Sequence, residues 1–129
     1  MNKILVEVSI GELFDKISIL EIKKEKIIDA EKLKFINNEY NILKEQLDNN
    51  IKTDEKLNKL IKSLKEINAK LWVIEDDKRM CEKNSDFGEK FTKLSRNVHF
   101  FNDDRAKIKL EINNYTGSKI KEIKEYTNY

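Results

Sequence analysis

The sequence predicts an all-α protein, and three of its features support this class. Charged residues make up 39% of the 129 residues and hydrophobic residues another 39%, whereas about 25% charged residues is typical of globular chains. Proline is absent and only three glycines are present, so few positions interrupt a helix. Apolar residues also recur in alternating steps of three and four, as in amphipathic helices. A chain of this length predicts a single domain over residues 1–129.

The start of the chain predicts a short arm followed by a helix. Residues 3–8, KILVEV, are β-prone but too few for more than an extended arm or a single strand. Ser9 can cap a helix, and a glutamate three positions later is its expected capping-box partner. We expect this helix over residues 10–28, with Glu21 in the middle of one of its apolar sides.

Two heptad-patterned stretches follow and predict a pair of helices. Residues 33–47 and 57–74 repeat apolar side chains at steps of three and four, and the turn-forming stretch DNNIKTD lies between them. A short polar loop makes the two helices antiparallel. We therefore expect a coiled-coil-like hairpin over about 30–83 that protrudes from the rest of the bundle.

The last third of the chain predicts one long helix and one short helix. After the break NSDFG, an apolar register runs from Phe87 to Tyr115, and one position in it is occupied by Arg105. Ser118 can then cap a short final helix with Ile120 on its inner side. The prediction is a bundle of four to five helices with an extended N-terminal arm and a protruding hairpin.

The net charge, the length of the apolar runs and the cysteine content predict where the protein is located and which classes of partner are excluded. The net charge of +2 is too small for a dedicated nucleic-acid binder. No apolar run approaches the 18 or so residues that span a membrane, and Glu7 and Ser9 interrupt the start too early for a signal peptide. Cys81 is the single cysteine, so no intrachain disulfide forms and a cytoplasmic location is expected.

Two charged side chains occupy positions that their helix patterns assign to the interior. Glu21 and Arg105 each need a partner, because an unpaired buried charge costs several kcal/mol. We expect them either to pair with one another or to face a shared cavity. The first alternative is a structural ion pair that sets the helix register; the second is a functional pocket.

The arginines suggest the chemistry of such a pocket. Only Arg79, Arg96 and Arg105 are arginines, although lysine is abundant. The planar guanidinium group binds a carboxylate or phosphate through two parallel hydrogen bonds, which lysine cannot do. An anion site is therefore one interpretation, and ordinary pairing, such as Glu75 with Arg79 at i, i+4, is the other.

Metal-dependent and nucleophilic chemistry are weaker interpretations. The acids in the same segments are Glu75, Asp76, Asp77, Glu82, Asp103 and Asp104. Paired acidic helices hold Mg²⁺ in all-α nucleotide pyrophosphatases, but the spacing here does not reproduce their ExxE and ExxD arrangement. His99 has no obvious catalytic neighbour, Cys81 is expected in the core, and Trp72 is expected to fill a helix junction rather than stack on a ligand.

Four stretches of the chain form a recognisable set. They are DKISILEIK (15–23), LWVIEDDKR (71–79), FNDDRAKIKLEIN (101–113) and GSKIKEIKEY (117–126). As a set they resemble a family of small bacterial and phage proteins known only as a domain of unknown function. The resemblance covers most of the chain and implies no activity. The family pattern has Ala where Ser95 stands and a Tyr near His99, which argues against a histidine mechanism.

The resemblance also implies that the charged residues of these stretches share one end of the molecule. Combining it with the buried-charge pattern, we expect ligand contacts from Arg79, Arg96, Arg105, Lys16 and Lys109. We expect supporting roles for Asp15, Glu21, Glu75, Asp76, Asn102 and Asp103. Neither a metal ligand nor a cofactor is assigned.

The expected function is a cytoplasmic binding module for an anionic metabolite or for an acidic segment of a protein partner. One alternative is a Mg²⁺-dependent hydrolase of a phosphate compound that uses the same site. The other is a purely structural interaction module, in which the hairpin seam pairs between chains to form a homo-oligomer. Neither nucleic acid nor a membrane is expected as a partner, and the sequence alone does not decide whether a reaction is catalysed.

Overall fold

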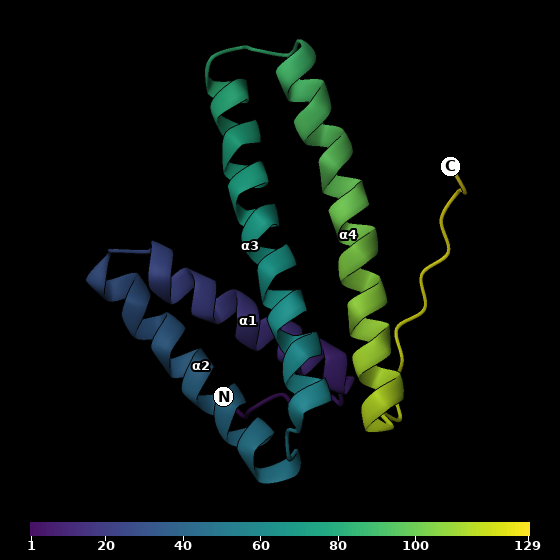
Figure 1. Ribbon diagram of the computed structural model, residues 1–129. Helices are drawn as coiled ribbons and strands as arrows, with labels where there is room; N and C mark the ends of the chain where they lie inside the picture. Colours follow the sequence, from purple (N-terminus) through teal and green to yellow (C-terminus); the bar gives the residue numbers. More distant parts are fainter.

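The computed structural model describes all 129 residues and contains four α-helices and no strand (Figure 1). The helices are α1 (Ile10–Lys26), α2 (Ala30–Asn50), α3 (Glu55–Lys83) and α4 (Glu89–Thr116). The all-α prediction is therefore confirmed, and the chain before α1 is an extended, exposed arm, as expected. None of the four helices combines the length and the apolar character that crossing a membrane requires.

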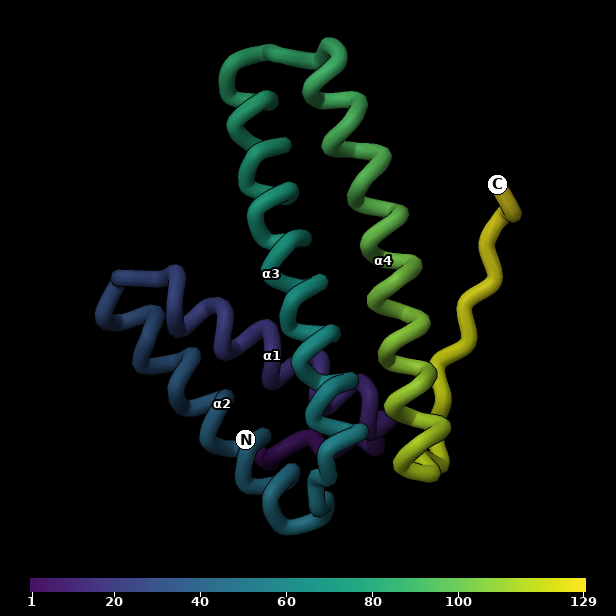
Figure 2. Tube along the Cα trace, viewed as in Figure 1, coloured from purple at the N-terminus to yellow at the C-terminus, as the bar shows by residue number.

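The four helices form two antiparallel hairpins that cross one another. α2 packs along α1, and α3 packs along α4, while α1 also contacts both α3 and α4. Figure 2 shows the α3–α4 hairpin extending well past the α1–α2 pair, so that its far half stands alone. A protruding hairpin is therefore present, but it is made by α3 and α4.

The predicted hairpin over 30–83 is wrong. The backbones of α2 and α3 do not approach one another closely, although a short loop joins the two helices. The heptad pattern shows that each helix has an apolar seam, but it does not say which helix covers that seam. α1 is apolar on two sides, so it packs against α2 on one side and against α3 and α4 on the other.

The hydrophobic core lies where the four helices meet. It contains Phe14 and Ile17 of α1, Leu47 of α2, Leu57 and Leu64 of α3, and Ile112 of α4, all of them buried. Because every helix contributes to this cluster, the two hairpins form one folded unit around it. The polar site described below lies beside this core, on the α1, α3 and α4 side.

The start of α1 is fastened to the end of α4. The Ser9 hydroxyl accepts a hydrogen bond from the Glu12 amide at 3.0 Å, as the capping pattern predicts. The Gly11 amide donates to Asn113 Oδ1 at 2.7 Å. A Cβ atom on Gly11 would lie 2.5 Å from the Lys109 carbonyl oxygen, so only glycine permits this approach of α1 to α4. The position of the whole of α1 thus depends on α4.

The predicted fifth helix is wrong. Gly117 ends α4 in the left-handed conformation, with φ of 70°, and residues 118–129 run back along α4 without helical structure (Figure 1). Ile120, expected on the inner side of this helix, is exposed, and so are Ile123 and Tyr126. A helix this short is marginal in water unless packing covers its apolar side, and here Ile123 and Tyr126 stay largely exposed although the segment runs along α4.

Candidate functional site

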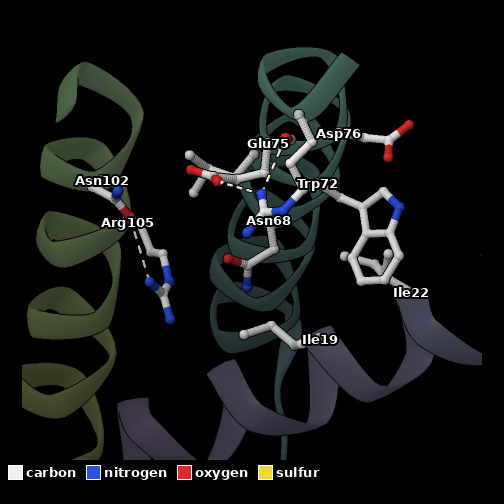
Figure 3. Close-up of a pocket in the computed structure, with 10 residues that line it drawn as sticks. Ile19, Ile22, Asn68, Trp72, Glu75, Asp76, Asn102 and Arg105 are labelled. Atoms are coloured by element: carbon white, nitrogen blue, oxygen red, sulfur yellow. Dashed lines mark hydrogen bonds and ion pairs between the residues drawn. The ribbon is translucent and has the colours of Figure 1, made fainter. Parts of the chain in front are cut away.

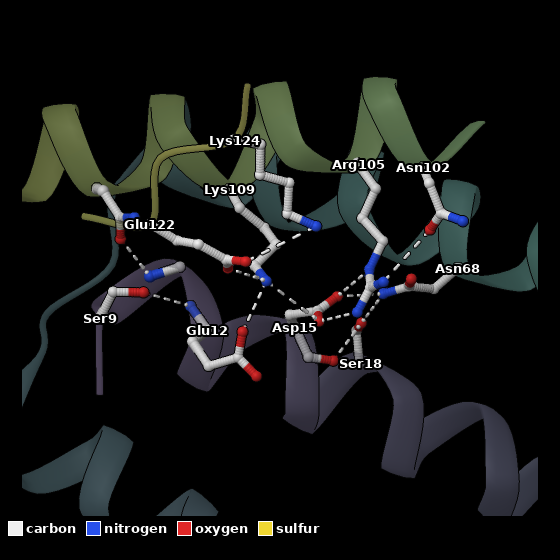
Figure 4. A network of polar contacts seen from close by, with 12 residues as sticks. Ser9, Glu12, Asp15, Ser18, Asn68, Asn102, Arg105, Lys109, Glu122 and Lys124 are labelled. Atoms are coloured by element: carbon white, nitrogen blue, oxygen red, sulfur yellow. Dashed lines mark hydrogen bonds and ion pairs between the residues drawn. The ribbon is translucent and has the colours of Figure 1, made fainter. Parts of the chain in front are cut away.

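A network of charged and amide side chains fills the junction of α1, α3 and α4, and Asp15 is at its centre (Figure 4). The Asp15 side chain is only 1% exposed. Arg105 Nε donates to Asp15 Oδ1 at 3.0 Å, and Arg105 Nη2 donates to Asp15 Oδ2. This two-bond contact joins α1 to α4 and fixes the plane of the guanidinium group.

Asn68 of α3 completes the surroundings of the carboxylate. Its amide nitrogen donates to Asp15 Oδ1 at 2.8 Å and to Ser18 Oγ at 2.7 Å. The Ser18 hydroxyl donates in turn to the Asp15 carbonyl oxygen at 2.9 Å. Both amide hydrogens of Asn68 therefore have an acceptor, and the carboxylate is held from α3 as well as from α4.

Lys109 closes the network on the side away from α3. Its Nζ lies 2.6 Å from Glu12 Oε2, 3.3 Å from Glu122 Oε2 and 3.8 Å from Asp15 Oδ2. The Glu12 carboxylate thus binds Lys109 and does not complete the capping box. Through Glu122 the network also holds the C-terminal segment against α4. No buried side-chain nitrogen or oxygen of the protein lacks a hydrogen-bond partner.

The surroundings keep the central groups charged. Burial alone would raise the pKa of Asp15, but hydrogen bonds from Arg105 and Asn68 and the positive charges of Arg105 and Lys109 outweigh it, so this pKa is lowered. Burial alone would lower the pKa of Lys109, but the hydrogen bond to Glu12 and the nearby carboxylates raise it. Asp15 and Lys109 are therefore both ionised at neutral pH.

A pocket of about 490 Å³ opens beside this network, at the crossing of α1 with α3 (Figure 3). Its polar lining consists of Asn68, Glu75, Asp76, Arg79, Asn102 and Arg105. Its apolar lining consists of Ile19, Ile22, Leu71 and Trp72. The pocket therefore has an apolar wall from α1 and α3 next to a set of hydrogen-bonding groups from α3 and α4.

The two arginines of the pocket keep unused donors. Arg105 has five N–H groups; two bind Asp15, and Nη1 contacts Asn102 Oδ1 at the long distance of 3.4 Å. Arg79 Nη1 donates to Glu75 Oε2 at 2.9 Å and to the Glu75 carbonyl at 3.1 Å. The Nε and Nη2 groups of Arg79 have no protein partner. Each guanidinium is thus oriented by a carboxylate while retaining hydrogens for another acceptor.

Both alternatives predicted for Glu21 and Arg105 are wrong, because the two side chains neither pair nor share a cavity: Arg105 lines the pocket and Glu21 does not. Glu21 Oε2 lies 3.0 Å from Lys65 Nζ, in an ion pair whose side chains are 36% and 37% exposed. The residue that pairs with Arg105 is Asp15, six positions earlier on the same helix. Six residues correspond to about 9 Å along a helix and about 120° around it, so the two carboxylates point to different neighbours.

The other predicted site residues separate into two groups. The pocket brings together Arg79, Arg105, Glu75, Asp76 and Asn102. Asp15 does not line the pocket but holds the Arg105 side chain in place. Four others do not line it either. Lys16 is exposed and Lys109 is held by carboxylates. Arg96 lies over the Phe100 ring at 5.8 Å, and Asp103 accepts a hydrogen bond from the Tyr129 hydroxyl. Of the three arginines predicted to contact a ligand, two therefore line the pocket.

Sequence reasoning missed Asn68 and Ser18. Both leave a signal that is visible in retrospect, since Asn68 follows the core residue Leu64 by four positions and Ser18 follows Phe14 by four. Each is therefore a small polar side chain on a buried face. Neither side chain carries a charge, so neither stands out in the sequence, although a buried carboxylate needs such neutral groups as much as it needs a cation.

The acids of the pocket do not form a metal site. Nowhere in the protein do three or more histidine, cysteine, aspartate or glutamate side chains converge in a way that could hold a metal ion. Glu75 is engaged by Arg79, and Asp103 is engaged by Tyr129. The chemistry offered by the pocket is hydrogen bonding from guanidinium and amide groups beside an apolar wall.

Comparison with known proteins gives a family and no activity. No curated protein and no solved structure matches the chain. A family model described as a family of unknown function, DUF6165, matches residues 4–129 and so includes every residue of the network and the pocket. The predicted membership of a family of unknown function is thus confirmed, and the chain belongs to the DUF6165 family.

Proposed function

We propose that the protein is a cytoplasmic binding module that holds a small carboxylate with an apolar or aromatic body in the pocket between α1, α3 and α4. The observation that carries this proposal is the state of Arg105. Its side chain is fixed by Asp15, is 27% exposed, and lines a pocket with an apolar wall. A guanidinium that is already oriented binds an oxygen anion without first losing conformational freedom.

The charge balance favours a ligand with one negative charge. Arg105 is neutralised by Asp15 and Arg79 by Glu75, so the pocket offers oriented N–H groups without a surplus of positive charge. The carboxylate of Asp76 also lines it. A multiply charged phosphate compound would meet uncompensated repulsion in these surroundings, whereas a single carboxylate finds two guanidinium groups and the Asn102 amide.

The apolar wall selects the rest of the ligand. Ile19, Ile22 and Leu71 present branched aliphatic side chains, and Trp72 adds an aromatic surface on which a planar group can stack. A volume of about 490 Å³ lies within the usual range of small-molecule pockets. The cytoplasmic part of the proposal rests on the single, unpaired and buried Cys81.

Titration calorimetry with paired compounds tests the proposal. A panel of aliphatic and aromatic monocarboxylates is compared with the corresponding primary amides, and we expect binding of the acids only. Arg79→Gln should weaken that binding by about tenfold or more, because it removes a charge-assisted donor. It leaves the Asp15–Arg105 pair intact.

Arg96→Gln is the matched control, since it removes the same charge from a position outside the pocket. We expect it to leave affinity unchanged. If no acid of the panel binds, or if both substitutions weaken binding equally, the pocket is not the site and the proposal fails.

Neither alternative function gains support from the site. A Mg²⁺-dependent hydrolase needs carboxylates that are free to bind the ion, and those of Glu75 and Asp103 are engaged. A purely structural interaction module does not account for the pocket, although association with another chain is compatible with ligand binding.

A further inference from the structure

The N-terminal arm, residues 1–8, precedes α1 as a segment without secondary structure (Figure 2), and its central apolar side chains are largely exposed. Ile4 is 90% exposed, Leu5 is 87% exposed and Val6 is 76% exposed. No backbone amide or carbonyl of residues 1–8 takes part in a backbone hydrogen bond. The segment is rich in β-formers, and an unpaired extended segment of this kind is a template for pairing with another strand.

The protein as a whole has more surface than a compact monomer. Its accessible surface is 9768 Å² at 15.3 kDa, whereas a folded monomer of that mass has about 7,100 Å². Interfaces of obligate homodimers bury about 2,000–5,000 Å² or more in total over both subunits, so an excess on the order of 2,600 Å² per chain is enough surface for such an interface. The arm, the C-terminal segment and the far half of the α3–α4 hairpin all contribute to it.

We infer that a second copy of the chain pairs with this arm, so that the two arms form an antiparallel two-stranded ribbon. One register places Leu5 opposite Leu5 of the second copy, on the twofold axis. In that register Lys3 lies opposite Glu7, and Glu7 opposite Lys3. Ile4 lies opposite Val6 in the same way. The three central apolar residues, Ile4, Leu5 and Val6, thus each lie opposite an apolar residue, and each lysine lies opposite a glutamate.

Neighbouring registers lose this complementarity. A shift of two residues in one direction places Lys3 opposite Leu5, and in the other direction it places Glu7 opposite Leu5. Either shift leaves a charge facing an apolar side chain across the ribbon. Since side chains alternate between the two faces of a strand, the favoured register also gathers Ile4, Val6 and Val8 of both copies on one face. The interaction is therefore specific for a second copy in a single alignment.

Sedimentation equilibrium over a wide concentration range tests the inference. The average mass of the wild-type protein should rise from 15.3 kDa towards twice that value. Lys3→Glu and Glu7→Lys should each raise the dimer Kd roughly tenfold, because both symmetry-related pairs become repulsive. The double variant Lys3→Glu with Glu7→Lys restores opposite charges in both pairs and should restore the wild-type Kd.

Two further variants complete the experiment. Leu5→Asp places two carboxylates against one another on the axis and should give a monomer at every concentration. Lys52→Glu changes the net charge as Lys3→Glu does but lies in the loop after α2, and it should leave the dimer intact. The arm has no backbone hydrogen bonds to the helical body, so circular dichroism should show unchanged helix content in all variants.

The inference is overturned by any of three results. The wild-type protein could remain monomeric throughout, the dimer could persist in Leu5→Asp, or the double charge exchange could fail to restore association. None of these outcomes bears on the pocket, because the arm does not line it. Failure of the dimer and failure of carboxylate binding are thus distinguishable.

Discussion

Asp15 and Arg105 are separated by 90 positions in the chain, yet they form a two-bond ion pair that joins α1 to α4 beneath the pocket. The carboxylate is fully enclosed, whereas the guanidinium is partly open to the pocket. The pair therefore belongs to the scaffold through Asp15 and to the candidate binding site through Arg105.

Removing one member of this pair should destabilise the protein. Arg105→Met leaves the Asp15 carboxylate buried without its main partner, and we expect a loss of about 2–4 kcal/mol in the free energy of unfolding, measured with urea. The double variant Asp15→Asn with Arg105→Met removes both charges and should recover part of that loss. If the single variant is as stable as the wild type, the pair does not contribute to the scaffold.

The corresponding change at Glu21 should have little effect. Glu21→Gln removes a half-exposed pair with Lys65, and such pairs contribute about 0–1 kcal/mol. Urea unfolding of Glu21→Gln beside Asp15→Asn compares two carboxylates of one helix in different surroundings. Equal losses would show that burial does not distinguish them.

Stability should fall in acid because of Asp15. Its pKa in the folded protein is below the ordinary value of 3.8, so the unfolded chain binds the proton more readily than the folded protein does. The contribution of Asp15 is fully present above pH 3.8 and is lost as the pH falls through the lowered folded value. Melting temperatures between about pH 2 and 6 measure this loss, and the slope should be shallower in Asp15→Asn. A slope that is unchanged in that variant would assign the acid sensitivity to other carboxylates.

Gly11 should tolerate no side chain. In Gly11→Ala the new Cβ would lie 2.5 Å from the Lys109 carbonyl oxygen and 2.9 Å from Asn113 Oδ1, so α1 and α4 must separate. We expect a loss of about 1–3 kcal/mol in thermal or urea unfolding. Gly88→Ala is the control, because the nearest atom to its Cβ is a side-chain oxygen at 3.7 Å, and its cost should be smaller. Equal costs at the two glycines would contradict the close contact.

The existence of the helices could be predicted from the sequence, but their partners could not. Caps such as Ser9 and the three-and-four spacing of apolar residues act locally, so they are visible in one stretch of chain. Which apolar seam packs against which other seam depends on the shapes of the helix surfaces and on how all four helices compete for the same contacts. A sequence pattern therefore does not distinguish the predicted α2–α3 hairpin from the α3–α4 hairpin of the structure.

For the candidate site, too, the sequence predicts which residue is unusual but not which residue is its partner. Arg105 interrupts an apolar register, which predicts a cation turned towards the interior, and the structure places it there, paired with Asp15 and with 27% of its side chain exposed. Its partner was misassigned, because Asp15 and Glu21 both lie on apolar sides of α1 and only the crossing angle with α4 decides between them. Neutral donors such as Asn68 do not stand out in a sequence, since they disturb the apolar pattern less than a charge does.

The contact between the start of α1 and the end of α4 has a consequence for protein synthesis. The Ile10 amide donates to Ser118 Oγ at 3.1 Å and the Gly11 amide donates to Asn113 at 2.7 Å, so the first helix finds these acceptors only after more than a hundred further residues have been added. A nascent chain still attached to the ribosome therefore holds α1 and α2 without their final support. Closure of the fold must await release of α4 from the exit tunnel.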